Sequence, residues 1–148
     1  MGFVKFRCAK VGGKMIVNTK FGKNPKLWEF INIYDSEFGD NVSIGAFSEI
    51  GGSKIGNNVR FQAHSFVPPG YVIEDNVFWG PGARGANDPK LDGKLLGSTI
   101  KEGAKIGMGA LIMGGITIGK NAKIGMGCIV IHDVPDNATV VGNPGRVI

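Results

Sequence analysis

Residues 100–130 read IKEGAK IGMGAL IMGGIT IGKNAK IGMGCI V, with an isoleucine or valine at every sixth position. An α-helix would bring apolar residues back every three or four positions and a half-buried strand every two, so neither period fits. A six-residue repeat that opens on a large apolar residue is typical of short strands joined by tight bends. Three such strands complete one turn of a solenoid.

The same six-residue frame extends back to Phe21 and is interrupted between Trp79 and Ile100. Its seventeen first positions are all apolar, whereas a chain with 43% hydrophobic residues would give about seven by chance. They are Phe21, Leu27, Ile33, Phe38, Ile44, Ile50, Ile55, Phe61, Val67, Ile73, Trp79, Ile100, Ile106, Ile112, Ile118, Ile124 and Val130.

Two gaps of five residues, 33–38 and 50–55, each close a group of three first positions. This spacing fixes the corners and groups the strands into six turns. We therefore expect an all-β protein, a parallel β-helix in which every sixth side chain points into a three-walled interior. The residues expected on one inner wall include Ile44, Phe61, Ile106 and Ile124.

The chain has 148 residues, which suits a single domain, and 25 glycines without a G-X-Y period, which excludes collagen. Residues 88–99 break the frame and are predicted to form one protruding loop, a kind of segment that often carries function on a stiff scaffold. Residues 1–20 are expected to form an N-terminal cap and residues 133–148 a C-terminal cap. The coils then comprise residues 21–87 and 100–132.

The formal net charge is +5, and residues 1–26 hold seven basic side chains and no acidic one. No RNA-recognition, zinc-finger or basic-helix signature accompanies them, so nucleic acid is not an expected partner. Cys8 and Cys128 show no paired spacing and are expected to be free thiols. Because the N-terminus lacks an apolar signal core, we expect a cytoplasmic protein without membrane contact.

Side chains at the fourth place of a hexad leave the prism at a corner. His64 holds this place, Phe47 and Gly82 hold it in the turns on either side, and Gly109 and Gly127 continue the column. We therefore expect a groove beyond His64 that takes a long, thin ligand. Histidine, with an ordinary pKa of about 6.5, is the side chain best suited to act as a base near neutral pH. The plain alternative is that His64 is a solvated corner residue.

The hexad frame resembles that of the hexapeptide-repeat acyltransferases, whose fold is a left-handed parallel β-helix. Four segments resemble the branch that N-acetylates amino sugars carried on nucleoside diphosphates: residues 27–34 (LWEFINIY), 55–60 (IGNNVR), 63–66 (AHSF) and 73–81 (IEDNVFWGP). Residues 140–148 (VVGNPGRVI) are similar to the closing motif of the wider superfamily.

This resemblance implies an acetyl-CoA-dependent acetyltransferase in which the substrate amine attacks the thioester directly, with His64 as base and no metal ion. The residues expected to contact acetyl-CoA are Gly109, Ala110 and Gly127 along its arm, and Lys120 and Arg146 at its phosphates. Those expected to contact the nucleotide-linked amino sugar are Gln62, Arg84 and Asn87. The resemblance also implies a homotrimer with active sites shared between subunits.

Two other functions stay open from the sequence. An O-acetyltransferase acting on a sugar or serine hydroxyl would use the same base and coenzyme, whereas a non-catalytic β-solenoid scaffold would bind no coenzyme. A zinc carbonic anhydrase needs three histidine ligands per metal, and the chain has only His64 and His132, so the sequence argues strongly against this function. We expect a structural role for His132 and no acyl-cysteine at Cys128, which falls at an inward-facing place.

Overall fold

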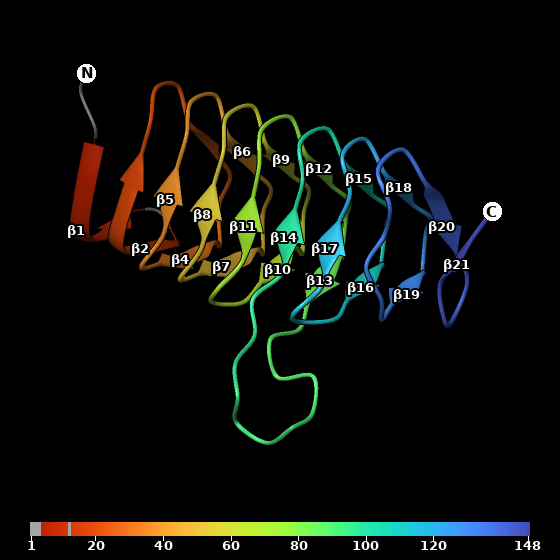
Figure 1. Ribbon diagram of the computed structural model, residues 1–148. Helices are drawn as coiled ribbons and strands as arrows, with labels where there is room; N and C mark the ends of the chain where they lie inside the picture. Colours follow the sequence, from red (N-terminus) through yellow and green to blue (C-terminus); the bar gives the residue numbers. More distant parts are fainter. Residues whose placement is uncertain (1–3, 12) are drawn as a thin grey trace.

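The protein is a left-handed parallel β-helix of about seven turns (Figure 1). The computed structural model describes residues 4–11 and 13–148, with side chains from residue 13 onward. Within this described part of the chain there is no helix, and most strands are two residues long. The expectation of an all-β hexapeptide solenoid with one protruding loop is confirmed.

The strands form three walls, numbered here in the order in which the chain passes through them. Wall 1 consists of β5 (Glu37–Phe38), β8 (Lys54–Ile55), β11 (Val72–Ile73), β14 (Thr99–Ile100) and β17 (Thr117–Ile118). Wall 2 consists of β3 (Lys26–Leu27), β6 (Ser43–Ile44), β9 (Arg60–Phe61), β12 (Phe78–Trp79), β15 (Lys105–Ile106), β18 (Lys123–Ile124) and β20 (Thr139–Val141). Wall 3 consists of β4 (Asn32–Tyr34), β7 (Glu49–Gly51), β10 (Phe66–Val67), β13 (Arg84–Gly85), β16 (Leu111–Ile112) and β19 (Ile129–Val130). The ends carry β1 (Val4–Val11) with β2 (Lys14–Phe21), and β21 (Arg146–Val147).

The register stacks the predicted first positions above one another. On wall 2, Phe61 pairs with Ile44 on one side and Trp79 on the other, and Ile106 pairs with Trp79 and Ile124. These five side chains are each at most 3% exposed. Because the ladders are parallel and in register, each hexad adds one side chain to a continuous apolar column. The predicted inner wall is confirmed.

Asparagine makes most of the corners between walls 1 and 2. Asn24, Asn41, Asn58 and Asn76 all lie in the left-handed backbone region, with φ between 54° and 61°. The amides of Asn24, Asn41 and Asn58 each donate a 3.2 Å hydrogen bond to the Oδ1 atom of the next asparagine in the column. Asparagine tolerates this region better than most residues with a side chain, so the amide ladder supports the bend with little backbone strain.

Gly85 stands where the frame calls for a large aliphatic side chain, and the structure shows what fills the space. A Cβ atom on Gly85 would lie 2.6 Å from Cζ of Tyr71, whose ring is 1% exposed. The Tyr71 hydroxyl lies 3.0 Å from the carbonyl oxygens of both Ala86 and Ile112, which share its single hydrogen as acceptors. Burial raises the pKa of Tyr71 to about 12. A tyrosine from the preceding corner thus replaces the missing core residue.

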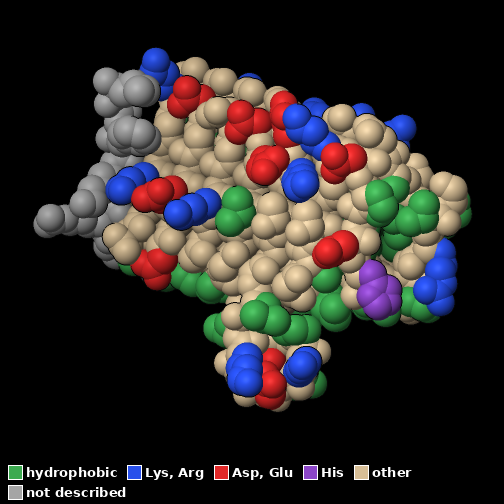
Figure 2. Space-filling model, in the orientation of Figure 1, with side chains coloured by type: hydrophobic (Ala, Val, Ile, Leu, Met, Phe, Trp, Pro, Cys, Tyr) green, Lys and Arg blue, Asp and Glu red, His purple; other side chains and the backbone are tan. Residues whose placement is uncertain are grey.

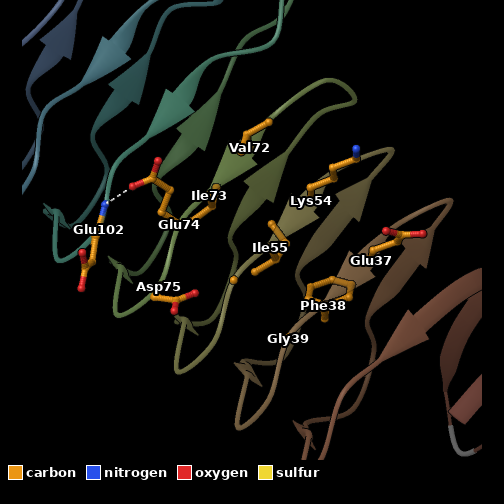
Figure 3. A pocket seen from close by; sticks show the side chains of 11 residues that line it. Glu37, Phe38, Gly39, Lys54, Ile55, Val72, Ile73, Glu74, Asp75 and Glu102 are labelled. Atoms are coloured by element: carbon orange, nitrogen blue, oxygen red, sulfur yellow. Dashed lines mark hydrogen bonds between the residues drawn. The ribbon is translucent and has the colours of Figure 1, made fainter. Parts of the chain in front are cut away.

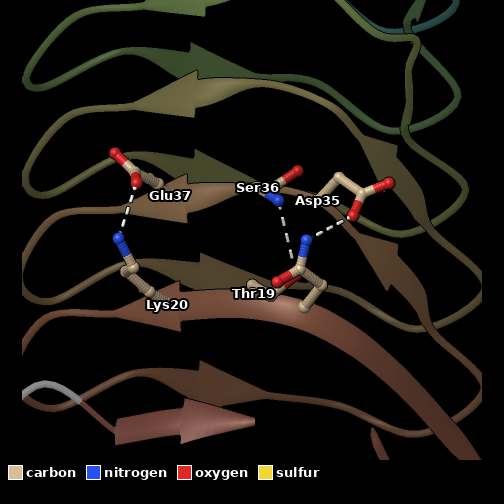
Figure 4. A network of polar contacts seen from close by, with 6 residues as sticks. Thr19, Lys20, Asp35, Ser36 and Glu37 are labelled. Carbon is tan, nitrogen blue, oxygen red and sulfur yellow. Dashed lines mark hydrogen bonds and ion pairs between the residues drawn. The ribbon is translucent and has the colours of Figure 1, made fainter. Parts of the chain in front are cut away.

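The N-terminal end is closed by a β-hairpin. Strand β1 pairs antiparallel with β2, and β2 also pairs in parallel with β4 and β5, so residues 14–20 already lie in the first turn of the solenoid. Figure 4 shows how polar side chains join β2 to the next turn: Lys20 forms a 3.0 Å ion pair with Glu37, and Thr19 Oγ1 accepts the N–H of Ser36. At the other end, Val140 pairs with Ile124, and β21 pairs antiparallel with β20.

The loop leaves the prism between β13 and β14, at the corner between walls 3 and 1 (Figure 1). The Asp88 carboxylate organises its tip by accepting the backbone N–H groups of Asp92 (3.1 Å) and Gly93 (3.0 Å). Leu91 is 90% exposed, and Lys and Asp side chains gather at the end of the loop in Figure 2. At its base, the Leu96 N–H donates to the Asn87 carbonyl at 2.6 Å. The two ends of the loop are therefore held side by side.

Candidate functional site

The corner between walls 2 and 3 carries a column of fourth-place residues in the left-handed backbone region. Its members change from aromatic to glycine along the prism. They are Phe30, Phe47 and His64 (φ 59°, 59° and 60°), followed by Gly82, Gly109 and Gly127 (φ 65°, 66° and 65°). We call the first three residues the aromatic column and the last three the glycine column. His64 stands at the boundary between them.

The rings of the aromatic column stack on one another. Phe30 and Phe47 have centroids 5.2 Å apart and planes inclined by 8°, and Phe47 and His64 have centroids 5.1 Å apart and planes inclined by 10°. A bulky residue in the left-handed region costs roughly 1–2 kcal/mol, and an aromatic pair contributes about 0.5–1.5 kcal/mol beyond its buried area. The free energy gained by stacking is therefore similar to the free energy cost of the backbone conformation. A gain in stability alone does not explain why aromatic side chains stand at this corner.

The glycine column leaves the corner open. A Cβ atom built on Gly82, Gly109 or Gly127 would meet nothing within 4 Å. Met108 and Met126, next to these glycines in the chain, are exposed. The corner is therefore free of side chains beyond His64, which the groove expected from the sequence would require.

A hollow of about 380 Å³ lies beside His64 on the wall 3 side of the corner. It is lined by Phe47, Glu49, His64, Ser65, Phe66 and Arg84. The sixth-place residues Glu49, Phe66 and Arg84 are cross-strand neighbours on β7, β10 and β13. Of the residues expected to contact the acceptor, Arg84 is brought together with His64, and within the described chain it has no ion-pair partner. Glu49 and Phe66 are new members of the site, and the hexad register could have identified them.

The other two acceptor candidates lie away from this hollow. The carbonyl oxygen of Gln62 accepts a 2.6 Å hydrogen bond from the Ser65 hydroxyl, so its backbone shapes the corner, while its side chain does not line the hollow. The Asn87 amide donates to the Pro69 carbonyl at 3.1 Å, at the base of the loop. Asn87 therefore does not line the hollow beside His64.

The candidate phosphate ligands have different surroundings. Lys120 forms a 2.9 Å ion pair with Glu102, and this hydrogen bond raises the pKa of the lysine. It follows a wall 1 strand and so lies at a different corner from Gly109 and Gly127. Arg146 is exposed and follows Gly145, whose N–H donates to the Ile129 carbonyl at 2.8 Å. Arg146 therefore lies near the C-terminal end of the glycine column.

The remaining reactive side chains do not form a second centre. Cys128 is buried, and desolvation raises the pKa of its thiol, which disfavours a thiolate nucleophile. His132 is exposed beyond the last strand of wall 3. Among the described residues, no group of three histidine, cysteine, aspartate or glutamate side chains could hold a metal ion. No helix in that part of the chain is long and apolar enough to cross a membrane.

A larger hollow of about 620 Å³ lies on the outside of wall 1 (Figure 3). Carboxylates line it, including Glu37, Glu74 and Glu102, with Lys54 among them; the Glu102 N–H donates to Oε2 of Glu74 at 2.9 Å. The hollow has no histidine, and so it lacks a side chain whose ordinary pKa suits a base at neutral pH. We therefore take the corner at His64, rather than the larger hollow, as the candidate active site.

Comparison with known proteins identifies the repeat. The family model described as "Bacterial transferase hexapeptide (six repeats)" matches residues 97–132, and the one described as "Hexapeptide repeat of succinyl-transferase" matches residues 38–67. Serine acetyltransferase from Bacillus subtilis is 58% identical over 50 residues, which cover 34% of this chain. The chain spans only 23% of the length of the curated relatives that it matches.

Solved structures share the fold over most of the chain. AntD, an N-acyltransferase from Bacillus cereus solved with dTDP and coenzyme A, has a TM-score of 0.81 at 21% identity, covering 86% of this chain and 81% of that one. GDP-perosamine N-acetyltransferase from Caulobacter crescentus, solved with CoA and GDP-perosamine, has a TM-score of 0.56 at 20% identity, covering 91% of this chain and 56% of that one. At these identities the likeness shows the fold.

Proposed function

We propose that this protein, two segments of which match hexapeptide-repeat transferase models, is an acetyl-CoA-dependent acetyltransferase that N-acetylates a nucleoside-diphosphate-linked amino sugar. One observation carries this proposal above the others: the corner column changes at His64 from stacked rings to an open glycine groove. His64 thus stands where the stacked rings end and the open, glycine-lined corner begins, a place suited to a general base beside a linear ligand.

The glycine column would hold the donor. Gly109, Ala110 and Gly127 allow the extended arm of acetyl-CoA to approach the backbone, because no side chain occupies the corner. Arg146, at the far end of the column, would pair with its phosphates. Lys120 would have to exchange Glu102 for a phosphate in order to contribute. Complexes of AntD and the perosamine enzyme with coenzyme A support this choice of donor.

His64 would act as the general base. Its imidazole accepts a proton from the acceptor amine as the nitrogen attacks the thioester carbonyl carbon. The carbon–sulfur bond then breaks, and the imidazolium returns the proton to the leaving thiolate. No covalent enzyme intermediate is needed, in keeping with the buried Cys128 thiol.

The acceptor would enter from the hollow beside His64. Arg84, which has no ion-pair partner among the described residues, supplies a cation suited to a diphosphate, while Gln62 and Asn87 remain candidates for contacts from the corner and the loop. The dTDP and GDP-perosamine in the AntD and perosamine transferase structures support a nucleotide-linked acceptor.

We also propose a homotrimer with shared active sites. The exposed leucines of the loop, Leu91 and Leu95, lie at the corner between walls 3 and 1, whereas the exposed Phe30 and Phe47 lie at the corner between walls 2 and 3. The two apolar surfaces cannot cover each other within one subunit. A neighbouring subunit could bring its loop to the His64 corner and cover both.

The test is a calorimetric titration with acetyl-CoA, followed by acetyl-transfer assays with dTDP-, UDP- and GDP-linked amino sugars and with serine. We expect acetyl-CoA binding and transfer to one nucleotide-linked amine. His64→Ala should abolish most transfer, while His132→Ala, the matched histidine control, should not. An absence of acetyl-CoA binding at millimolar concentration would favour a scaffold.

Serine O-acetylation is the second candidate, favoured by the 58% identity with serine acetyltransferase over 50 residues. It predicts turnover of free serine, with no gain from a nucleotide on the acceptor.

A further inference from the structure

Two corners of the same turns both need a residue in the left-handed backbone conformation, and they use different side chains there. At the corner between walls 1 and 2, Asn41 and Asn58 take the left-handed conformation and their amides hydrogen-bond to each other at 3.2 Å. At the corner between walls 2 and 3, Phe47 and His64 take the same conformation with rings instead. Asparagine would serve the bend at both corners. The rings at the second corner therefore call for a further explanation.

Among the side chains that the structure describes, no polar group orients the His64 imidazole. A catalytic base is usually held by a third group that hydrogen-bonds to its other side. In the described residues, neither ring nitrogen of His64 has a hydrogen-bond or ion-pair partner, and only the backbone N–H of this residue is engaged, at 2.9 Å from the Ala46 carbonyl. The ring contact that the structure does provide is the stack on Phe47.

Phe30 supports the stack of Phe47 on His64 from the side away from the histidine. Phe30 lies against the far face of Phe47, and a Cβ atom on Gly13 would lie 3.1 Å from Cδ1 of Phe30. On the other side of His64 the corner at Gly82 is open. One face of the imidazole is thus supported by two further rings, while the opposite face looks along the glycine column.

We propose that Phe47 is the positioning residue of His64, an inference that rests on the proposed transferase function. Both ring nitrogens lie in the imidazole plane, and stacking on Phe47 fixes that plane. A fixed plane keeps one nitrogen directed at the incoming amine while the open face borders the thioester end of the groove. The aromatic column takes the place of the hydrogen-bonding partner that His64 lacks.

The decisive variant is Phe47→Asn, since asparagine is the residue that other corners of this protein use. It should leave the thermal unfolding midpoint equal to or above that of the wild type. We expect kcat to fall about tenfold or more because the base is no longer held in line, with KM for acetyl-CoA within about twofold. Phe47→Tyr, which keeps the ring, should restore kcat to within about twofold of the wild type. Phe30→Asn, one ring further from His64, is the matched control and should lose less than Phe47→Asn.

A second readout does not depend on turnover. The carbon-bound imidazole protons of His64 should show an upfield NMR shift from the Phe47 ring, and Phe47→Asn should remove this shift. A wild-type protein that transfers no acetyl group would refute the proposed function, and the NMR shift would still test the stack. The positioning role is overturned if Phe47→Asn turns over at the wild-type rate, if Phe47→Tyr is as slow, or if Phe47→Asn lowers residual activity equally in a His64→Ala background.

Discussion

The phenol of Tyr71 occupies the core space that Gly85 leaves empty, so one turn of the prism is completed by a side chain from the turn before. Gly85→Ala should destabilise the protein by about 1–3 kcal/mol, because a Cβ atom would lie 2.6 Å from Tyr71 Cζ. Urea unfolding measures the loss. In a Tyr71→Leu background the same substitution should cost less, and an equal loss in both backgrounds would contradict the contact.

The same tyrosine makes stability fall at high pH. Its pKa is about 12 in the folded protein against an ordinary 10.0, so the unfolded chain releases the proton first as the pH rises. The stability linked to this group is complete below pH 10 and is lost between pH 10 and pH 12. The pKa difference corresponds to at most ~3 kcal/mol. Urea unfolding of the wild type and Tyr71→Phe across this range should show curves that converge as the pH rises; parallel curves would rule out the assignment.

Filling the glycine groove should block the donor without unfolding the protein. Gly109 has a φ of 66°, a region that asparagine tolerates, and no atom would lie within 4 Å of a new Cβ. Gly109→Asn should therefore weaken acetyl-CoA binding about tenfold or more in calorimetry, with a thermal midpoint close to that of the wild type. Gly93→Asn places the same side chain at an open, left-handed glycine of the loop and should leave the affinity unchanged. Equal affinities for the two variants would place the donor elsewhere.

The two candidate phosphate ligands can be separated by substitution. Arg146 has no ion-pair partner among the described residues, whereas Lys120 is paired with Glu102. We expect Arg146→Gln to raise the Kd for acetyl-CoA about tenfold through the loss of a charge-assisted contact, and Lys120→Gln to raise it less. Lys54→Gln, on the outside of wall 1, serves as the charge control. A larger effect at Lys120 would show that its ion pair opens to receive the ligand.

Removing the apolar surface of the loop should weaken assembly. Leu91→Asp and Leu95→Asp change exposed side chains and should leave the fold of each subunit intact. Sedimentation velocity should show a shift from trimer toward monomer at micromolar concentration, together with a fall in kcat. Lys90→Asp, in the same loop, is the control for charge alone. A trimer that persists in both leucine variants would exclude the loop from the interface.

Much of the fold follows from the sequence because the repeat has a single period. Each first-position residue from Phe21 to Val130 needs only its place in the hexad to be assigned to a wall, and the ladders confirm this, as in the pairing of Phe61 with Trp79. The pairing of Val140 with Ile124 could not be predicted from the six-residue frame, because the chain after Val130 has no regular hexads. The start of the solenoid at Lys14 was also hidden, because β2 is one long strand that spans two walls.

The site was harder to predict because its residues come from different hexad places. The column from His64 to Gly127 can be extracted from the sequence, since it has the repeat's own period. The neighbours Glu49 and Phe66 depend on which side chains of adjacent strands share an outer surface, and that requires the register. The pairing of Lys120 with Glu102 joins third-place residues of adjacent turns and follows from the same register.

The 2.6 Å hydrogen bond from the Leu96 N–H to the Asn87 carbonyl keeps the two ends of the protruding loop at a fixed separation. Whatever lies between Asn87 and Leu96 can be lengthened, shortened or exchanged without altering the spacing of the coils above and below. The choice of acceptor and the acetyl-transfer step would then depend on separate parts of this molecule. Grafting a loop from another chain between these two residues would be the natural way to change the acceptor.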